Sequence, residues 1–171
     1  MMVEQDGKTV WLPDQPYEEG SWGYIGGEKF VMKESNRHPY GSNKSIHNTS
    51  HDPIYQTQRV GLDQFKFDVP DGYYEIIFHF AELLSGGERK DLAYNLDKTT
   101  VKEEAGERKF DVILNNTLFL KGLSNNSRLI PKQPYSTSTR VVVENGEGLT
   151  IDFSPTKGEA VLNAIQLKRI Y

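Results

Sequence analysis

Residues 72–82 have the sequence Gly72-Tyr73-Tyr74-Glu75-Ile76-Ile77-Phe78-His79-Phe80-Ala81-Glu82. Large apolar side chains fall on every even-numbered position from 74 to 80. This is the pattern of a β-strand, whose side chains point alternately to its two faces. The odd-numbered positions are also largely apolar. A strand with two apolar faces is typical of a protein interior, so this stretch is predicted to be a central strand buried on both faces.

The segments on either side of this strand also alternate. Residues 65–69 have apolar side chains at every second position, and Pro70-Asp71-Gly72 supplies residues typical of a turn. Downstream, residues 110–114 alternate again, and Asn115-Asn116 predicts a tight hairpin turn. Further strands are predicted at residues 117–120, 137–143, 149–153 and 161–170.

The pattern as a whole predicts an all-β fold. No segment of helical length has apolar residues spaced by three and four. Many short strands separated by turns with Gly and Pro favour an antiparallel β-sandwich of the jelly-roll type. Two regions depart from this pattern. Residues 1–53 are rich in Gly, Pro and aromatic residues and have weak strand signals, and residues 83–109 form a polar insertion longer than the ~12–15 residues of an ordinary loop.

Length and composition exclude several classes of protein. The 171 residues suit one domain, and the net charge of −4 comes without a stripe of clustered Lys and Arg, so no nucleic-acid partner is expected. No apolar run approaches ~18 residues, so no membrane-spanning helix is expected. The chain has no cysteine, which excludes disulfides and thiolate sites and favours a bacterial source over a eukaryotic extracellular one.

Four motifs, in this order, resemble the malectin domain family. They are Tyr55-Gln56-Thr57-Gln58-Arg59, the strand Gly72–Glu82, Arg108-Lys109-Phe110-Asp111-Val112, and Ala160-Val161-Leu162-Asn163-Ala164-Ile165-Gln166-Leu167. The resemblance extends from one end of the chain to the other. It implies a galactose-binding-like jelly-roll sandwich of carbohydrate-binding ancestry.

The N-terminal half is similar to the malectin-like module at the C-terminal end of bacterial glycoside hydrolase family 2 β-galactosidases. The similarity lies in Trp11–Tyr17, Gly20–Gly27 and Leu92–Asp97. It implies a single domain, residues 1–171, excised from a larger hydrolase. The implied partners are the catalytic domains of that parent and a galactoside or plant-type oligosaccharide. Met1-Met2-Val3 begins no apolar leader, so localisation does not follow from this chain, and a bacterial parent of this kind is expected to be periplasmic or secreted.

Aromatic residues are the candidates for carbohydrate binding, because the apolar C–H faces of sugars pack on aromatic rings. In the animal malectin lectins, aromatic loop residues hold a glucose disaccharide, and the matching positions here are Val60, Leu84 and Ser85. A replacement platform is therefore predicted from Trp22, Tyr24, Tyr40 and Tyr94. The alternative is that these rings pack the N-terminal half of the domain or contact another domain.

Charged residues at the strand ends are assigned structural roles. Glu82 and Arg108 flank the insertion. An ion pair between them accounts for Glu82 better than a catalytic role, since glycoside hydrolysis needs a second carboxylate and none is evident. Arg59 is expected to bind loop carbonyls. We therefore predict no catalytic residues in this chain, with a glycoside hydrolase as its parent.

No cofactor or metal is expected. His47 and His51 have the spacing of two metal ligands on a helix, but their neighbours predict a loop without further ligands. Calcium, which loop oxygens bind in many jelly rolls, is left open because no spaced Asp motif is present. Two functions remain. One is a carbohydrate-binding module that holds substrate near a catalytic domain, and the other is a structural module that packs between domains of its parent without binding sugar.

Overall fold

The computed structural model describes residues 2–5, 8–30, 41–42, 45–50, 52–84 and 107–171. These residues form strands and one short helix, with nearly all of the regular structure in strands. The bounds are β1 Met2–Gln5, β2 Lys8–Trp11, β3 Trp22–Lys29, α1 Asp52–Gln56, β4 Arg59–Phe67, β5 Gly72–Ala81, β6 Lys109–Leu114, β7 Thr117–Ser124, β8 Pro134–Val143, β9 Leu149–Lys157, β10 Val161–Leu162 and β11 Ala164–Arg169.

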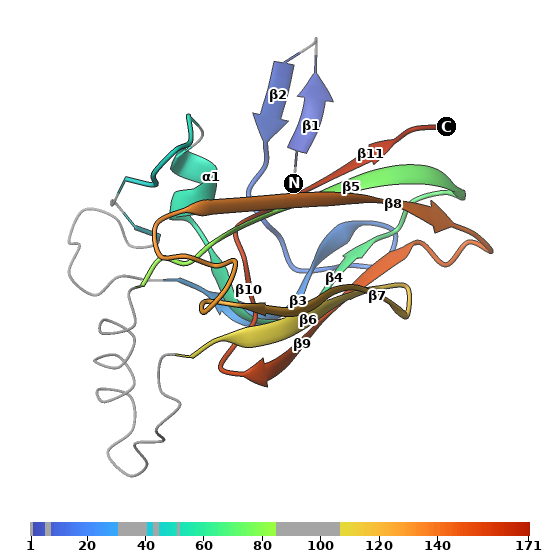
Figure 1. Ribbon diagram of the computed structural model, residues 1–171. Coiled ribbons are helices and arrows are strands. Elements are labelled where there is room, and N and C mark those ends of the chain that lie inside the picture. The colour runs from blue at the N-terminus through green and yellow to red at the C-terminus, as the bar shows by residue number, and fades with distance from the viewer. Residues whose placement is uncertain (1, 6–7, 31–40, 43–44, 51, 85–106) are drawn as a thin grey trace.

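Two antiparallel sheets face each other as the upper and lower layers of Figure 1. The larger sheet has the strand order β10-β4-β9-β6-β7, with β3 also paired to β4. The smaller sheet has the order β11-β5-β8. Strands β1 and β2 form a separate hairpin that projects from the sandwich. The predicted antiparallel β-sandwich is confirmed.

Strand β5 lies at the centre of the smaller sheet, and its inner face is fully buried. The side chains of Ile76, Phe78 and Phe80 are completely inaccessible to solvent. The outer face is covered only at its C-terminal end, and Tyr73 is 56% exposed. The prediction of two buried faces is therefore wrong for the first half of the strand, because no described segment covers the outside of the sheet there.

Aromatic rings fill the space between the two sheets. Phe78 and Phe80 stack nearly parallel, with ring centroids 5.9 Å apart. Phe80 also contacts Phe110 from the opposite sheet at 6.1 Å, and Phe110 contacts Phe153 at 6.4 Å. Offset and tilted ring pairs of this kind add to the free energy gained by burying apolar surface.

The turn at residues 115–116 forms as predicted. Asn115 and Asn116 have positive φ angles of 41° and 64°, which suits the two-residue turn that joins β6 to β7. Strand β3, by contrast, was not predicted, because its glycines interrupt the alternation of apolar side chains. The register of β3 on β4 shifts between Ile25 and Gly26, and Gly26 adopts a positive φ of 75°, so this strand lacks a continuous alternation.

The C-terminal segment was predicted as one strand and is two. Residues Val161–Leu162 pair with β4 in the larger sheet, whereas Ala164–Arg169 pair with β5 in the smaller one. Asn163 lies at the crossing between the sheets. Apolar residues lie on both sides of Asn163, so the segment was taken as one strand and the change of sheet was not predicted.

The side chain of Asn163 joins three segments at this crossing. Its Oδ1 accepts hydrogen bonds from the backbone nitrogen of Ala81 at 2.7 Å and from Gln58 Nε2 at 3.1 Å. Its Nδ2 donates to the carbonyl oxygens of Tyr55 at 2.9 Å and Thr57 at 2.8 Å. The end of β5 and the connection from α1 to β4 are thus held by one side chain.

We expect Asn163→Ala to lower the free energy of unfolding by about 3 kcal/mol, because it removes the partners of several buried backbone groups. Chemical denaturation monitored by tryptophan fluorescence measures the change. Gln133→Ala, which truncates an exposed amide, is the control and should change stability by less than ~0.5 kcal/mol. Equal effects of the two substitutions would contradict a structural role for Asn163.

Candidate functional site

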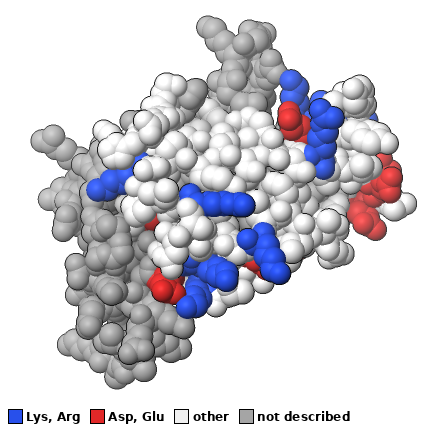
Figure 2. Space-filling view, in the orientation of Figure 1, with Lys and Arg blue, Asp and Glu red and all other residues white. Residues whose placement is uncertain are grey.

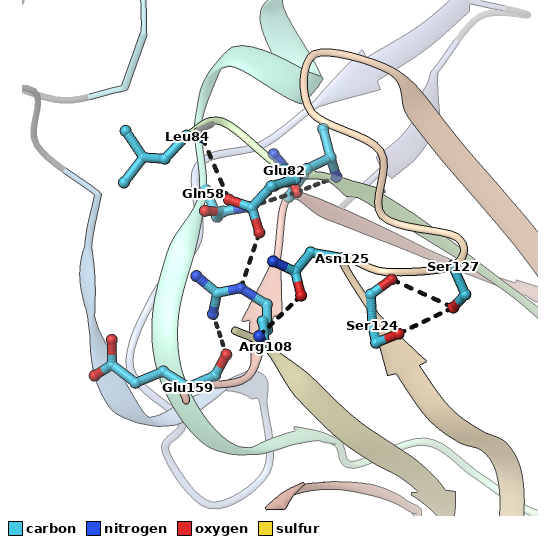
Figure 3. Close-up of polar contacts among 10 residues, drawn as sticks. Gln58, Glu82, Leu84, Arg108, Ser124, Asn125, Ser127 and Glu159 are labelled. Atoms are coloured by element: carbon cyan, nitrogen blue, oxygen red, sulfur yellow. Dashed lines mark hydrogen bonds and ion pairs between the residues drawn. The ribbon is translucent and has the colours of Figure 1, made fainter. Parts of the chain in front are cut away.

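The carboxylate of Glu82 is buried at the end of β5 and paired with Arg108 (Figure 3). Glu82 is 1% exposed, and its Oε2 accepts a hydrogen bond from Arg108 Nε at 3.0 Å. Arg108 Nη1 donates to the backbone oxygen of Glu159, and the backbone nitrogen of Arg108 donates to Asn125 Oδ1 at 2.9 Å. The pair holds together the two chain segments that flank residues 85–106. A carboxylate in this position has no open path to a substrate.

A cavity of about 440 Å³ lies where the β2–β3 connection passes the start of β4 and the junction of β10 with β11. This volume is within the range of small-ligand sites in proteins. We call it the edge pocket. Its lining combines apolar and polar side chains, among them Trp11, Leu12, Asp14, Phe30, Ile54 and Arg59.

The segment that carries Asp14 is held against β3 by backbone contacts. The nitrogen of Tyr24 donates to the oxygen of Gln15 at 2.9 Å, and Gln15 Nε2 donates to the oxygen of Trp22 at 2.9 Å. Gly23 allows this close approach, since a Cβ there would lie only 2.5 Å from the oxygen of Gln15. The connection between β2 and β3 is therefore fixed in place and forms one wall of the edge pocket.

The Trp11 ring meets a buried histidine at the pocket. Its centroid lies 5.5 Å from that of His79, edge to face. His79 Nδ1 is hydrogen-bonded to the Tyr55 hydroxyl at 2.8 Å, and His79 Nε2 lies 2.9 Å from Gln166 Nε2. Burial raises the pKa of the Tyr55 phenol above its ordinary value. The contacts on both sides of His79 fix the ring against which Trp11 packs.

Arg59 opens strand β4 and is 6% exposed. Its Nε donates to Asp14 Oδ2 at 2.6 Å, and its Nη1 donates to the oxygen of Gly27 at 3.0 Å. The guanidinium carbon lies 3.3 Å from the centroid of the Tyr24 ring. Nη2 is buried and has no hydrogen-bond partner among the described residues. Arg59 was expected to bind loop carbonyls, and the carbonyl that it contacts belongs to Gly27 in strand β3.

Two of the aromatic residues expected to form a sugar platform, Trp22 and Tyr24, do not line the edge pocket. Trp22 stacks on Phe65 with ring centroids 6.2 Å apart and forms part of a second, more open cavity of about 460 Å³. One face of the Tyr24 ring is covered by Arg59. Tyr40 and Tyr94 lie outside the described residues.

The positions that match the lectin aromatics belong to a small apolar cluster. Leu84 is buried together with Phe30, Ile46 and Tyr55, and Val60 packs against this cluster. Ser85 lies outside the described residues. At these positions the chain uses aliphatic side chains to pack the end of the sandwich.

A family model for the malectin domain matches residues 2–167 of the 171-residue chain. The chain belongs to the malectin domain family.

The malectin domain is also similar to parts of larger solved structures. One is Bacteroides uniformis β-glucuronidase, with 27% sequence identity and a TM-score of 0.72 over 99% of this chain and 17% of that protein. Bacteroides uniformis β-glucuronidase 2 covalently bound to cyclophellitol-6-carboxylate aziridine matches with 27% identity and a TM-score of 0.73, over 99% of this chain and 17% of that one. This chain therefore spans about a sixth of the length of these relatives.

Plant receptor ectodomains share the fold at lower sequence identity. The ANXUR2 extracellular domain from Arabidopsis thaliana is 16% identical, with a TM-score of 0.62 over 99% of this chain and 45% of that one. The crystal structure of plant peptide RALF23 in complex with FER and LLG2 contains a match at 17% identity and a TM-score of 0.59, over 97% of this chain and 45% of that one. No curated protein matches this chain.

Charged groups on the malectin domain are dispersed. On the face shown in Figure 2, Lys and Arg side chains lie in small groups separated by uncharged surface. Within the described part of the chain no cluster of three His, Asp or Glu residues has the arrangement of a metal site, and His47 is exposed in a turn. His51 lies outside that part. The helix that the structure describes is too short to cross a membrane.

Sequence reasoning missed Trp11, Asp14 and Phe30 as pocket residues. Trp11 and Asp14 stand in the stretch that resembles the hydrolase modules, so their position in the chain was noted without a role. Nothing in the spacing of these residues along the chain indicates that they meet Arg59. Their proximity depends on the pairing of β3 with β4, which the glycines of β3 concealed.

Glu82→Gln is expected to lower the free energy of unfolding by about 3–5 kcal/mol, because it leaves the buried Arg108 guanidinium without its counter-charge. Urea denaturation at neutral pH measures the loss. Glu107→Gln is the matched control. Glu107 Oε2 pairs with Lys157 Nζ at 2.8 Å, but both side chains are about 40% exposed, so its loss should cost less than ~1 kcal/mol. A similar loss in both variants would show that burial does not distinguish the two pairs.

Proposed function

We propose that this malectin domain is a non-catalytic carbohydrate-binding accessory module of a larger glycoside hydrolase. The observation that carries the proposal is the edge pocket. It combines an aromatic ring, Trp11, with an acidic and a basic side chain, Asp14 and Arg59. Carbohydrate sites need both features, since sugars present apolar C–H faces as well as hydroxyl groups.

The unused hydrogen-bonding capacity of Arg59 supports a ligand in this pocket. A buried donor without a partner is rare in folded proteins, because the loss of hydration is not compensated. Arg59 Nη2 is such a donor. This nitrogen is closed to solvent, so a hydroxyl or ring oxygen of a bound sugar reaches it only if the Arg59 side chain shifts toward the pocket. The charge of Arg59 is already paired with Asp14, so no anionic ligand is needed to neutralise it.

The solved relatives support the accessory role. The chain matches one part of the Bacteroides uniformis β-glucuronidase, and the rest of that protein, which is much longer, has no counterpart in it. An attached module that binds sugar raises the local concentration of substrate near a catalytic domain. That the parent is a bacterial β-galactosidase stays a prediction from sequence resemblance. The similarity to β-glucuronidase makes a β-glucuronidase a second candidate for the parent.

A structural role between domains is the second candidate, and a separate surface favours it. Tyr73 and Val142 are paired across β5 and β8 and are 56% and 43% exposed. Tyr171 contacts Tyr73 edge to face, with centroids 6.3 Å apart. Exposed apolar side chains grouped in this way are typical of contact surfaces. This surface, which we call the outer tyrosine patch, lies on the smaller sheet, whereas the edge pocket lies at the sheet junction.

We expect the domain to bind at least one member of a panel of galactosides, glucuronides and plant-polysaccharide oligomers. A pocket with one aromatic wall and few hydrogen bonds gives weak affinity, with a Kd on the order of 0.1–1 mM. Isothermal titration calorimetry measures it. Trp11→Ala should weaken binding by about 2- to 10-fold, as expected for the loss of one aromatic contact.

Two matched variants show whether the edge pocket is the site. Tyr73→Ser removes an exposed aromatic of the outer tyrosine patch and should leave sugar binding unchanged. Trp22→Phe alters the ring that the sequence placed in the platform and should also have no effect. Binding that is lost in Trp22→Phe and kept in Trp11→Ala would move the site to the cavity beside Trp22. The absence of binding across the panel at millimolar sugar would leave the interdomain role.

The isolated chain should not hydrolyse aryl β-galactosides or aryl β-glucuronides. Hydrolysis requires two accessible carboxylates on either side of the glycosidic bond. Glu82 is buried and ion-paired with Arg108, so it cannot serve as either of these two carboxylates. Release of nitrophenol from the two aryl glycosides measures the activity. Turnover that co-purifies with the domain and is lost in Glu82→Gln, while the folded fraction is unchanged, would contradict the assignment.

A further inference from the structure

Strand β8 lies at an edge of the smaller sheet, and no described strand pairs with its outer side (Figure 1). We propose that this free edge binds the same edge of a second copy of the chain, with the two β8 strands antiparallel about a two-fold axis at Ser138. The three-stranded sheets of the two copies then form one continuous sheet. No residue of β8 lines the edge pocket, so this association is independent of sugar binding.

Strand β8 lacks the features that protect the other sheet edges from pairing with a second chain. Short strands, bulges, charges and covering segments are the usual protection. Strand β3 has a register shift before Gly26, and its Tyr24 is hydrogen-bonded to the preceding connection. The pairing of β7 with β6 has two register shifts, and β11 has six residues and ends in Lys168-Arg169. By contrast, β8 has ten residues, pairs with β5 without a register shift, and has one charged residue, Arg140.

The hydrogen bonds of β5 show which backbone groups of β8 point to the free edge. The backbone oxygen of Tyr73 accepts a hydrogen bond from the nitrogen of Ile170, on the β11 side of β5. Alternate residues of a strand direct their backbone groups to opposite sides, so the even-numbered residues of β5 face β8, where their partners are odd-numbered. The backbone groups of residues 136–142 with even numbers therefore face outward and bond to no described backbone group. The oxygen of Arg140 also receives a long contact from Thr139 Oγ1 at 3.4 Å, which leaves its second lone pair available.

The free edge of β8 is complementary to itself when two copies run antiparallel about Ser138. In this register every even-numbered residue lies opposite an even-numbered residue of the second copy, so the outward amide and carbonyl groups face each other. The same register keeps the inner side chains of both strands on the inner face of the joined sheet. The charge of Arg140 lies opposite Ser136 of the second copy, so no like charges meet across the axis.

Apolar side chains that the edge leaves partly in water also gain partners. On the inner face, Tyr135 stacks on Phe80 with ring centroids 6.3 Å apart and lies opposite Val141 of the second copy. Tyr135 and Val141 are both partly buried against the core. On the outer face, Val142 is 43% exposed and lies opposite Pro134 of the second copy. Pairing therefore continues the core across the junction and removes apolar surface from water.

Sedimentation equilibrium of the intact chain measures this association. One pair of strand edges is a small interface, so we expect a reversible dimer with a Kd on the order of 0.1 mM. Ser138→Pro should weaken the dimer by about tenfold or more, because it removes the amide that donates across the axis in both copies while the bonds of β8 to β5 remain. Ser138→Ala keeps this amide and is the matched control, with a Kd within about twofold of the unaltered chain. Thermal unfolding confirms that each variant is folded.

Substitutions at Ser136 test the register. Ser136→Glu places a carboxylate opposite Arg140 of the second copy and should tighten the dimer by about 2- to 10-fold at low salt, whereas Ser136→Lys should weaken it by a similar factor. Opposite responses to Glu and Lys, together with the loss in Ser138→Pro, support pairing about Ser138. A chain that stays monomeric at millimolar concentration, a dimer that survives Ser138→Pro in the folded protein, or a dimer weakened by Ser136→Glu would overturn the proposal.

Discussion

The hydrogen bonds of the Asn163 side chain are the constraint on which this end of the sandwich depends. Asn163 lies where the chain leaves the larger sheet as β10 and enters the smaller sheet as β11, and it bonds to the end of β5 and to the connection before β4. Gln58 shares the same oxygen of Asn163 and donates to the oxygen of Ala81. The residue after Gln58 is Arg59, so the network that joins the sheets also holds the start of β4, from which the Arg59 side chain reaches the wall of the edge pocket. Family motifs that are far apart in the sequence meet here for a structural reason.

The buried ion pair of Glu82 and Arg108 continues the same arrangement along the edge of the sandwich (Figure 3). Buried charges are tolerated only when they are paired and hydrogen-bonded, and both conditions hold, since Arg108 also donates to the oxygen of Glu159. Polar residues that look chemically reactive in the sequence are thus used to close the fold. The side chains that remain for binding a ligand lie beside these hydrogen-bonded residues, in the wall of the edge pocket. One nitrogen of Arg59 has no hydrogen-bond partner among the described residues, Asp14 stands on the connection between β2 and β3, and Trp11 is the last residue of β2.

Local patterns predicted the strands with regular alternation but did not predict the site. Alternation at residues 72–82 and 110–114 located β5 and β6, because each buries one regular face. Strand β3 was missed because its bulge at Gly26 breaks the alternation, and the division of the last strand was missed because Asn163 changes sheets without changing the apolar pattern. The pocket depends on both of these features. Trp22 was predicted to bind sugar because it is aromatic. Its packing against Phe65 depends on the register between β3 and β4, which the sequence pattern did not indicate.

The central claim is that the network around Asn163 presents Arg59, Asp14 and Trp11 as a sugar site at the sheet junction. The most direct measurement is NMR chemical-shift mapping of the labelled domain during titration with a sugar that binds. The account predicts that the largest changes appear at the Trp11 indole, the Arg59 guanidinium and the backbone of residues 11–14, while the outer tyrosine patch is unaffected. Changes confined to Tyr73, Val142 and Tyr171, or to the surroundings of Trp22, would contradict it.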